Sequence, residues 1–205
     1  NFAAFEGTAG VDLNVENVIN SNITGQDVLV AVIDDGLELN HEDLVDNIVT
    51  GSYDFVDLDE DPFYEEGRTE GTHGLHVAGV IAAKGFNGIG VRGVAPNASV
   101  IGYNYLERQG SINQIKSWGI DPPIPVSPDI FNMSYGIGYG EDETKYSFYG
   151  EVPGVYDDAL TLATSSLRDG KGGIYVKSAG NSYRDNAAEN AGTSCGTVLS
   201  CTSMA

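Results

Sequence analysis

The feature that most constrains the fold is a continuous apolar run, 28–33, which ends in two adjacent carboxylates, Asp34 and Asp35. The run is rich in β-branched residues, a pattern typical of a strand buried on both faces of a parallel sheet. Strand-like stretches and helical patterns then alternate along the chain. The sequence therefore predicts an α/β fold with a mainly parallel sheet. The further strands are expected at 98–105, 129–134 and 173–178, and the helices at 12–18, 75–84 and 155–167.

Length and charge limit the function classes. The chain has 205 residues, enough for one α/β domain with a sizeable core. Its 30 acidic and 10 basic residues give a formal net charge of −20, which repels phosphate backbones, so we expect no nucleic-acid partner. The same charge favours solubility, and it attracts cationic substrates and divalent cations. No apolar run is long enough to span a bilayer, so no membrane span is expected.

The two cysteines, Cys195 and Cys201, are separated by five residues. They allow a small disulfide loop, which favours a secreted or periplasmic setting. Alternatively, either cysteine pairs with a residue outside this chain. Two cysteines alone cannot make a zinc site.

Polar residues at the predicted strand ends mark the expected site, because ligands of parallel sheets bind there. Asp34, Ser134 and Asn181 lie at such ends, and His73 opens a predicted helix. A helix N-terminus disfavours a cationic imidazole. A buried carboxylate that is hydrogen-bonded to the ring offsets this effect. It also fixes the tautomer and stabilises the imidazolium formed in general-base catalysis. Taken singly, Asp34 and His73 are better explained as an edge carboxylate and an unrelated surface histidine.

Four segments in the same order resemble the subtilisin-like serine proteases: 32–36, 73–79, 132–136 and 178–181. The adjacent Asp34 and Asp35, with 12–15 upstream, are more similar to the kexin and furin branch. The resemblance implies a subtilisin-like three-layer fold, with residues 1–205 forming part of a peptidase catalytic domain. It further implies a secreted serine endopeptidase that acts on polypeptides through an Asp-His-Ser acyl-enzyme mechanism.

The resemblance also assigns roles to residues. Asp34 would orient His73, His73 would be the general base, and the amide of Asn181 would donate to the oxyanion. The resemblance further implies six substrate-binding residues. Three form the wall of the first specificity pocket, and three are acids that would favour cleavage after paired basic residues. The wall is Ser134, Tyr135 and Gly136, and the acids are Asp35, Glu70 and Asp142. The alternative is that these acids belong to a generally acidic surface.

Two segments predict calcium-binding sites, because their oxygen ligands suit Ca²⁺. In the first, the resemblance implies the carboxylate of Asp43 with ligands from a later loop, namely Lys84, Asn87, Ile89 and Val91. In the second, a dense acidic run supplies Asp54, Asp59 and Asp61, as in an acidic calcium-binding loop of the furin branch. So many like charges repel unless a cation or water compensates them. The alternative for the second segment is therefore a solvated acidic loop.

The nucleophile is the missing part. Ser203 follows Thr202 as in the family motif, but it lies only 22 residues beyond Asn181, and Cys201 replaces the expected Gly. We therefore expect the nucleophile beyond Ala205, in a larger protease of which this chain is an internal fragment. A downstream domain, a propeptide or a chaperone would then be its partners.

Two other functions remain open. The first is a catalytically silent domain on the same scaffold that binds calcium or another protein. The second is a phospho-acceptor domain, because a strand that ends in two aspartates also occurs in receiver folds. That scaffold places its acceptor aspartate on a later strand and leaves His73 and Asn181 without a role.

Overall fold

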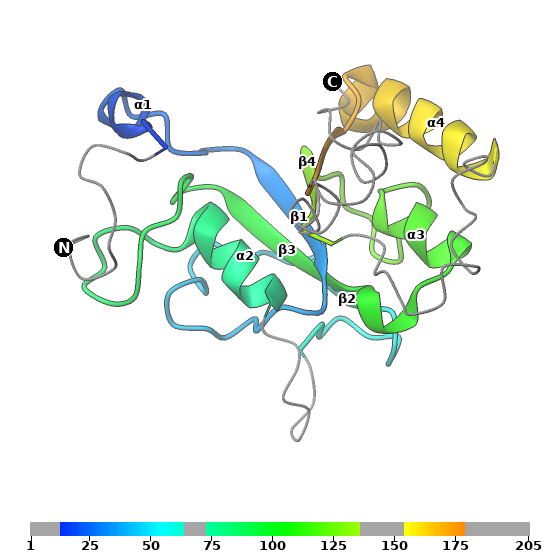
Figure 1. Ribbon diagram of the computed structural model, residues 1–205, viewed down its shortest axis with the longest axis horizontal. Coiled ribbons are helices and arrows are strands. Elements are labelled where there is room, and N and C mark those ends of the chain that lie inside the picture. The colour runs from blue at the N-terminus through cyan, green and yellow to red at the C-terminus, as the bar shows by residue number, and fades with distance from the viewer. Residues whose placement is uncertain (1–12, 64–72, 136–153, 179–205) are drawn as a thin grey trace, which may run out of the picture.

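The computed structural model describes residues 13–63, 73–135 and 154–178. Its centre is a five-stranded sheet in the order β2-β3-β1-β4-β5, in which every pair of neighbours is parallel (Figure 1). The strands are β1 (Leu29–Asp34), β2 (Tyr53–Asp54), β3 (Ser99–Asn104), β4 (Ile130–Met133) and β5 (Ile174–Lys177). The helices are α1 (Glu16–Asn20), α2 (His73–Ala82), the 3₁₀ turn η2 (Leu106–Arg108), α3 (Ser111–Ser117) and α4 (Gly154–Gly170).

The central strand β1 divides the core into two layers, because successive side chains of a strand point to opposite faces. Ala31 and Ile33 belong to a cluster that includes aromatic side chains of β3, β4 and β5 and two alanines of α4. Val30 and Val32 belong to a second cluster with Ala78 and Ala82 of α2. Helices therefore lie on both faces of the sheet, with α2 on one side and α3 and α4 on the other (Figure 1). This arrangement confirms the predicted three-layer α/β fold.

Several element boundaries differ from those predicted. The helix expected at 75–84 begins two residues earlier, at His73, because its start is fixed by a polar contact rather than by an apolar residue. The first helix lies at 16–20 rather than 12–18. Neither β2 nor α3 was expected from the sequence. Strand β2 has two residues and α3 has seven, so neither is long enough to give a clear periodic signal.

The strand register gathers polar residues at one edge of the sheet. Asp34 at the end of β1 is paired with Asn104 at the end of β3. On the other side, Ile33 is paired with Met133 of β4, so Ser134 follows at the same edge. Strand β1 thus stands between β3 and β4, where the strand order reverses, and such a switch point is the usual ligand site of open α/β sheets.

Within the described ranges, no helix combines the length and the apolar character that a membrane crossing requires.

Candidate active site

The carboxyl end of β1 and the first residue of α2 meet at a short hydrogen bond. Oδ1 of Asp34 lies 2.8 Å from Nδ1 of His73. The Asp34 side chain is completely buried, whereas the His73 side chain is 57% exposed. The buried carboxylate therefore holds one ring nitrogen, and most of the imidazole stays accessible. The structure thus brings together the two residues to which the sequence analysis assigned one site.

The environment perturbs both titrating groups. The hydrogen bond to Asp34 raises the pKa of His73 above its ordinary value of 6.5. Burial raises the pKa of Asp34 above its ordinary 3.8, although the hydrogen bond from His73 acts in the opposite direction. Oδ1 of Asp34 also accepts the backbone N–H of Asp35 at 2.9 Å. Its second oxygen, Oδ2, is buried and has no hydrogen-bond partner within the described part of the chain.

The next carboxylate, Asp35, contacts the backbone of the same helix. Its Oδ2 accepts the N–H of His73 at 3.1 Å, and its Oδ1 accepts the N–H of Gly74 at 2.7 Å. These amides are among the first N–H groups of α2, which have no partner inside the helix. The sequence predicted that Asp35 faces a substrate side chain. In the structure, both of its oxygens accept hydrogen bonds from the protein itself.

The predicted pocket wall follows β4 at the same edge. Oγ of Ser134 accepts a hydrogen bond from the Asn132 amide at 2.9 Å. The hydroxyl of Tyr135 accepts one from the Gln114 amide at 3.0 Å. The Tyr135 carbonyl accepts hydrogen bonds from the Lys177 ammonium and from Ser178 Oγ, both at the end of β5. Side chains from α3 and β5 therefore fix this segment beside the Asp34 strand end.

The first predicted calcium segment gathers around a buried carboxylate. Asp43 is 3% exposed. Its Oδ1 accepts the Asn87 side-chain amide at 2.7 Å, and its Oδ2 accepts the backbone N–H of Val91 at 2.8 Å. The Asp43 carbonyl accepts the N–H of Lys84 at 2.8 Å, and Oδ1 of Asn87 accepts the N–H of Ile89 at 3.3 Å. The structure thus brings the five predicted residues together.

The second predicted calcium segment is not assembled in this way. Asp54 is buried, and it accepts hydrogen bonds from the Asp57 N–H at 3.0 Å and the Asn104 amide at 2.8 Å. Asp59 and Asp61 are exposed, and Oδ1 of Asp59 accepts the N–H of Asp61 at 3.0 Å. Within the described residues, no three His, Cys, Asp or Glu side chains are grouped so that they could hold a metal ion.

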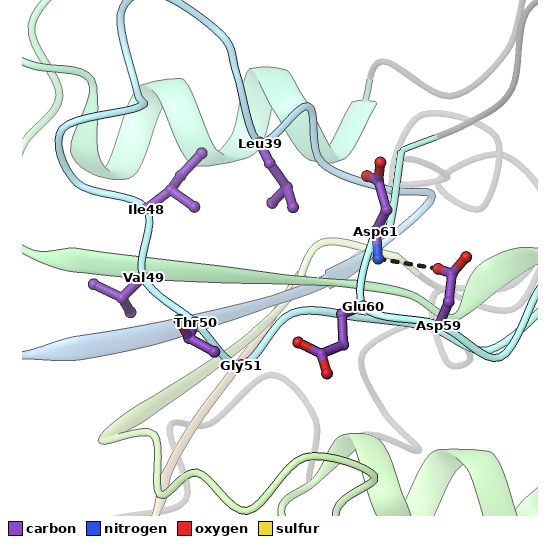
Figure 2. Close-up of a pocket in the computed structure, with 8 residues that line it drawn as sticks. All are labelled: Leu39, Ile48, Val49, Thr50, Gly51, Asp59, Glu60 and Asp61. Carbon is purple, nitrogen blue, oxygen red and sulfur yellow. Dashed lines mark hydrogen bonds between the residues drawn. The ribbon is translucent and has the colours of Figure 1, made fainter.

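Asp59 and Asp61 instead line an open pocket of about 560 Å³ beside apolar side chains (Figure 2). Figure 2 shows the Asp61 and Glu60 side chains extending in different directions. The lining does not include Asp34 or His73. The full lining is Leu39, Ile48, Val49, Thr50, Gly51, Asp59, Glu60 and Asp61.

Several predicted residues lie outside the described ranges. They are Asn181, Glu70, Gly136 and Asp142 of the predicted active site, Ser203, and the two cysteines Cys195 and Cys201.

Sequence reasoning missed two residues near the site. Asn104 ends β3 beside Asp34, and its amide donates to Asp54 at 2.8 Å. A polar residue that ends an apolar strand was an available signal for this position. Gln114 joins two tyrosines, because its Oε1 accepts the Tyr105 hydroxyl at 2.6 Å and its amide donates to Tyr135. No sequence signal pointed to Gln114, because it lies on the short unpredicted helix α3.

Comparison with known proteins identifies the family to which the chain is similar. A model of the subtilase family of peptidases matches residues 25–204. Over 191 residues the chain is 34% identical to the Aeromonas extracellular serine protease of Aeromonas sobria, and the match covers 91% of this chain and 29% of that protein. Over 193 residues it is 33% identical to furin of Rattus norvegicus, with 90% of this chain and 23% of furin covered.

Solved structures give the same result. The chain superposes on the Aeromonas sobria serine protease, crystallised with its chaperone ORF2, with a TM-score of 0.71 and 33% identity. That match covers 85% of this chain and 28% of the protease chain. A cold-adapted subtilisin-like serine proteinase matches with a TM-score of 0.52 and 28% identity, covering 78% of this chain and 48% of that one. The chain thus spans less than a third of the length of the Aeromonas protease and of furin.

Proposed function

Because the chain belongs to the subtilase family, we propose that it is part of the catalytic domain of a serine endopeptidase. The observation that carries the proposal is the 2.8 Å contact between the buried Asp34 carboxylate and the half-exposed His73 ring. Curated relatives named as serine or furin-like proteases support it. In this proposal the complete protein hydrolyses peptide bonds, and residues 1–205 supply the histidine that moves the proton and the aspartate that orients it.

In the proposed reaction His73 carries the proton, and Asp34 supports His73. Neutral His73 accepts the proton of a serine hydroxyl through Nε2 while that oxygen attacks the peptide carbonyl carbon. The C–N bond then breaks, and the imidazolium returns the proton to the leaving amine, which leaves an acyl-enzyme for water to hydrolyse. Asp34 holds Nδ1, so that Nε2 is the nitrogen that accepts the proton, and its negative charge stabilises the imidazolium. The serine would come from outside the described residues, and Asn181 would donate to the oxyanion.

We further propose that substrates carry basic residues before the cleaved bond. The net charge of −20 favours cationic peptides. The likeness to furin-like proteases supports the same preference, with Glu70 and Asp142 as the acids near the substrate. A propeptide or chaperone partner is supported by the solved complex of the Aeromonas protease with its chaperone. Secretion is supported by the extracellular Aeromonas relative.

Calcium is the proposed cofactor. The oxygen-bearing groups near Asp43, a buried carboxylate, a side-chain amide and the backbone of one loop, are of the kind that a hard cation prefers. In the structure Asp43 instead accepts N–H groups of Asn87 and Val91, so calcium binding requires the amide and the loop to turn their oxygens toward the ion. Asp43 and Asn87 would hold the ion with backbone oxygens of Lys84, Ile89 and Val91. When bound, calcium would neutralise the buried carboxylate and tie the loop to it. Asp54, Asp59 and Asp61 remain a second proposed site, which requires the acidic loop to rearrange.

The proposal is tested with the complete gene product and a fluorogenic peptide that carries Lys-Arg before the scissile bond. We expect hydrolysis by the native protein and a loss of about 10²- to 10⁴-fold in the His73→Ala variant, because the general base is removed. Asp158→Asn is the control, because it removes an exposed charge of α4. Equal hydrolysis by the native protein and the His73→Ala variant would remove His73 from the reaction.

A further inference from the structure

We propose that Asp35 is a positioning residue that holds the backbone of His73 in place, as the partner of Asp34, which holds the ring. This inference rests on the proposed hydrolytic function and deepens it. Two consecutive carboxylates at the end of one strand thus fix one histidine at two points.

Both oxygens of the Asp35 carboxylate accept hydrogen bonds from the start of α2, and this pair of contacts is called the clamp below. Oδ2 of Asp35 accepts the His73 N–H at 3.1 Å, and Oδ1 accepts the Gly74 N–H at 2.7 Å. The residues are 38 and 39 positions apart in the chain, so the contact is tertiary rather than a local cap. Asp35 follows directly on a β1 strand that is buried at every residue after Leu29. The carboxylate is therefore carried by a rigid part of the sheet.

The close approach of the strand end to α2 depends on the lack of a side chain at position 74. A Cβ at Gly74 would lie 2.2 Å from the Gly36 carbonyl oxygen, 2.9 Å from Asp34 Cβ and 3.2 Å from Asp35 Oδ1. The start of α2 therefore rests directly on residues 34–36. A carboxylate at this place is favourable, because the first N–H groups of a helix carry partial positive charge and charge-assisted hydrogen bonds are strong.

The consequence for catalysis follows from the two anchor points. The Asp34 hydrogen bond fixes the direction of the imidazole but does not contact the backbone of the helix start. The Asp35 hydrogen bonds fix the backbone from which the ring extends. A displacement of about 1 Å in a reacting group costs up to about 10²-fold in rate. Asp35 is therefore expected to act on every substrate, whatever side chain the substrate presents to it.

The test compares native protein, Asp35→Asn and Asp35→Ala in the complete gene product, with Asp158→Asn as the charge-matched control. Two peptides are used that differ only at the second residue before the cleaved bond, Lys in one and norleucine in the other. Asn keeps the shape of Asp but presents one acceptor oxygen in place of two, and Ala presents none. We expect kcat to fall about tenfold in Asp35→Asn and up to about 100-fold in Asp35→Ala, by the same factor with both peptides.

Two further readouts do not depend on hydrolysis. Hydrogen–deuterium exchange of the segment that contains the His73 and Gly74 amides should become faster in both variants. The pKa of His73, followed by NMR of its ring protons, should fall, because the Asp35 charge contributes to raising it, with Asp34 the other charged group that acts on this ring. Unfolding midpoints of the variants show whether the whole domain has been disturbed.

The outcomes distinguish the positioning role of Asp35 from the proposed hydrolytic function. A loss confined to the Lys peptide, with unchanged amide exchange, would overturn the positioning role and leave Asp35 as a substrate-binding residue. If the native protein cleaves neither peptide, the proposed hydrolysis fails. The clamp is then decided by the exchange measurement, and unchanged exchange in Asp35→Asn would overturn it.

Discussion

Replacement of Gly74 by Ala should disable the site, although Ala is normally the better helix residue. The ideal Cβ at position 74 lies 2.2 Å from the Gly36 carbonyl oxygen, and ordinary contact begins at 3.4 Å. The helix start must therefore move by the difference, 1.2 Å. If that movement falls on the Asp34–His73 contact, its 2.8 Å becomes about 4.0 Å, which is no longer a hydrogen bond.

The magnitudes follow from that displacement. We expect kcat/KM to fall about 10²-fold, and the free energy of unfolding to fall by about 1.5–3 kcal/mol through weakened hydrogen bonds to the Asp35 carboxylate. Gly79→Ala is the matched control on the same helix, because no described atom lies within 4 Å of its ideal Cβ position. That variant should gain about 0.5–1 kcal/mol from helix propensity and keep its activity.

The assay is peptide hydrolysis together with urea unfolding followed by circular dichroism, on both variants of the complete gene product. If Gly74→Ala matches Gly79→Ala within about twofold in kcat/KM and shows equal stability, the direct contact between α2 and residues 34–36 is not required. The positioning argument would then lose its steric basis.

Further predictions concern Asp34, His73, the loop around Asp43 and the core. Asp34→Asn should lower kcat by about 10⁴-fold, because an amide favours the wrong ring tautomer, and this is measured by steady-state kinetics. Activity should fall as the pH drops through a raised His73 pKa, above 6.5, since only neutral imidazole accepts the proton; a midpoint of the kcat/KM profile below 6.5 would contradict this. Asp43→Ala should abolish a calcium-dependent rise in melting temperature, which calorimetry with EGTA and with added Ca²⁺ measures. Asn104→Ala should cost about 1.5–3 kcal/mol in urea unfolding, because it removes a donor from the buried Asp54 carboxylate.

Much of the fold could be predicted from the sequence, because it follows from apolar periodicity. The run 28–33 indicated a strand buried on both faces, and β1 stands in the middle of the sheet. The pairing of Asp34 with His73 could be predicted too, since a strand end and a helix start were each visible in the chain. Short elements such as β2 could not be predicted, because two residues are too few to show a periodic apolar pattern.

The contacts of Asp35 with the start of α2 could not be predicted for a different reason. Its acidic side chain suggested a partner in the substrate, and nothing in the local sequence indicated that both oxygens would accept backbone amides of α2. Such a contact depends on how closely the helix approaches the strand end, which is a tertiary property. The apolar pattern of α2 begins only at 75, whereas the helix begins at His73, whose N–H donates to a carboxylate 38 residues upstream.

The central claim is that Asp34 and His73 activate a serine nucleophile in the complete protein. The most direct measurement is covalent labelling of the complete gene product by a peptidyl phosphonate with a basic residue at the reactive position, followed by intact mass and peptide mapping. We predict one adduct on a serine in the native protein, and labelling that is slower by at least about 10²-fold in His73→Ala. Labelling at the same rate in both proteins, or no labelling of a protein that still hydrolyses the peptide, would contradict the account.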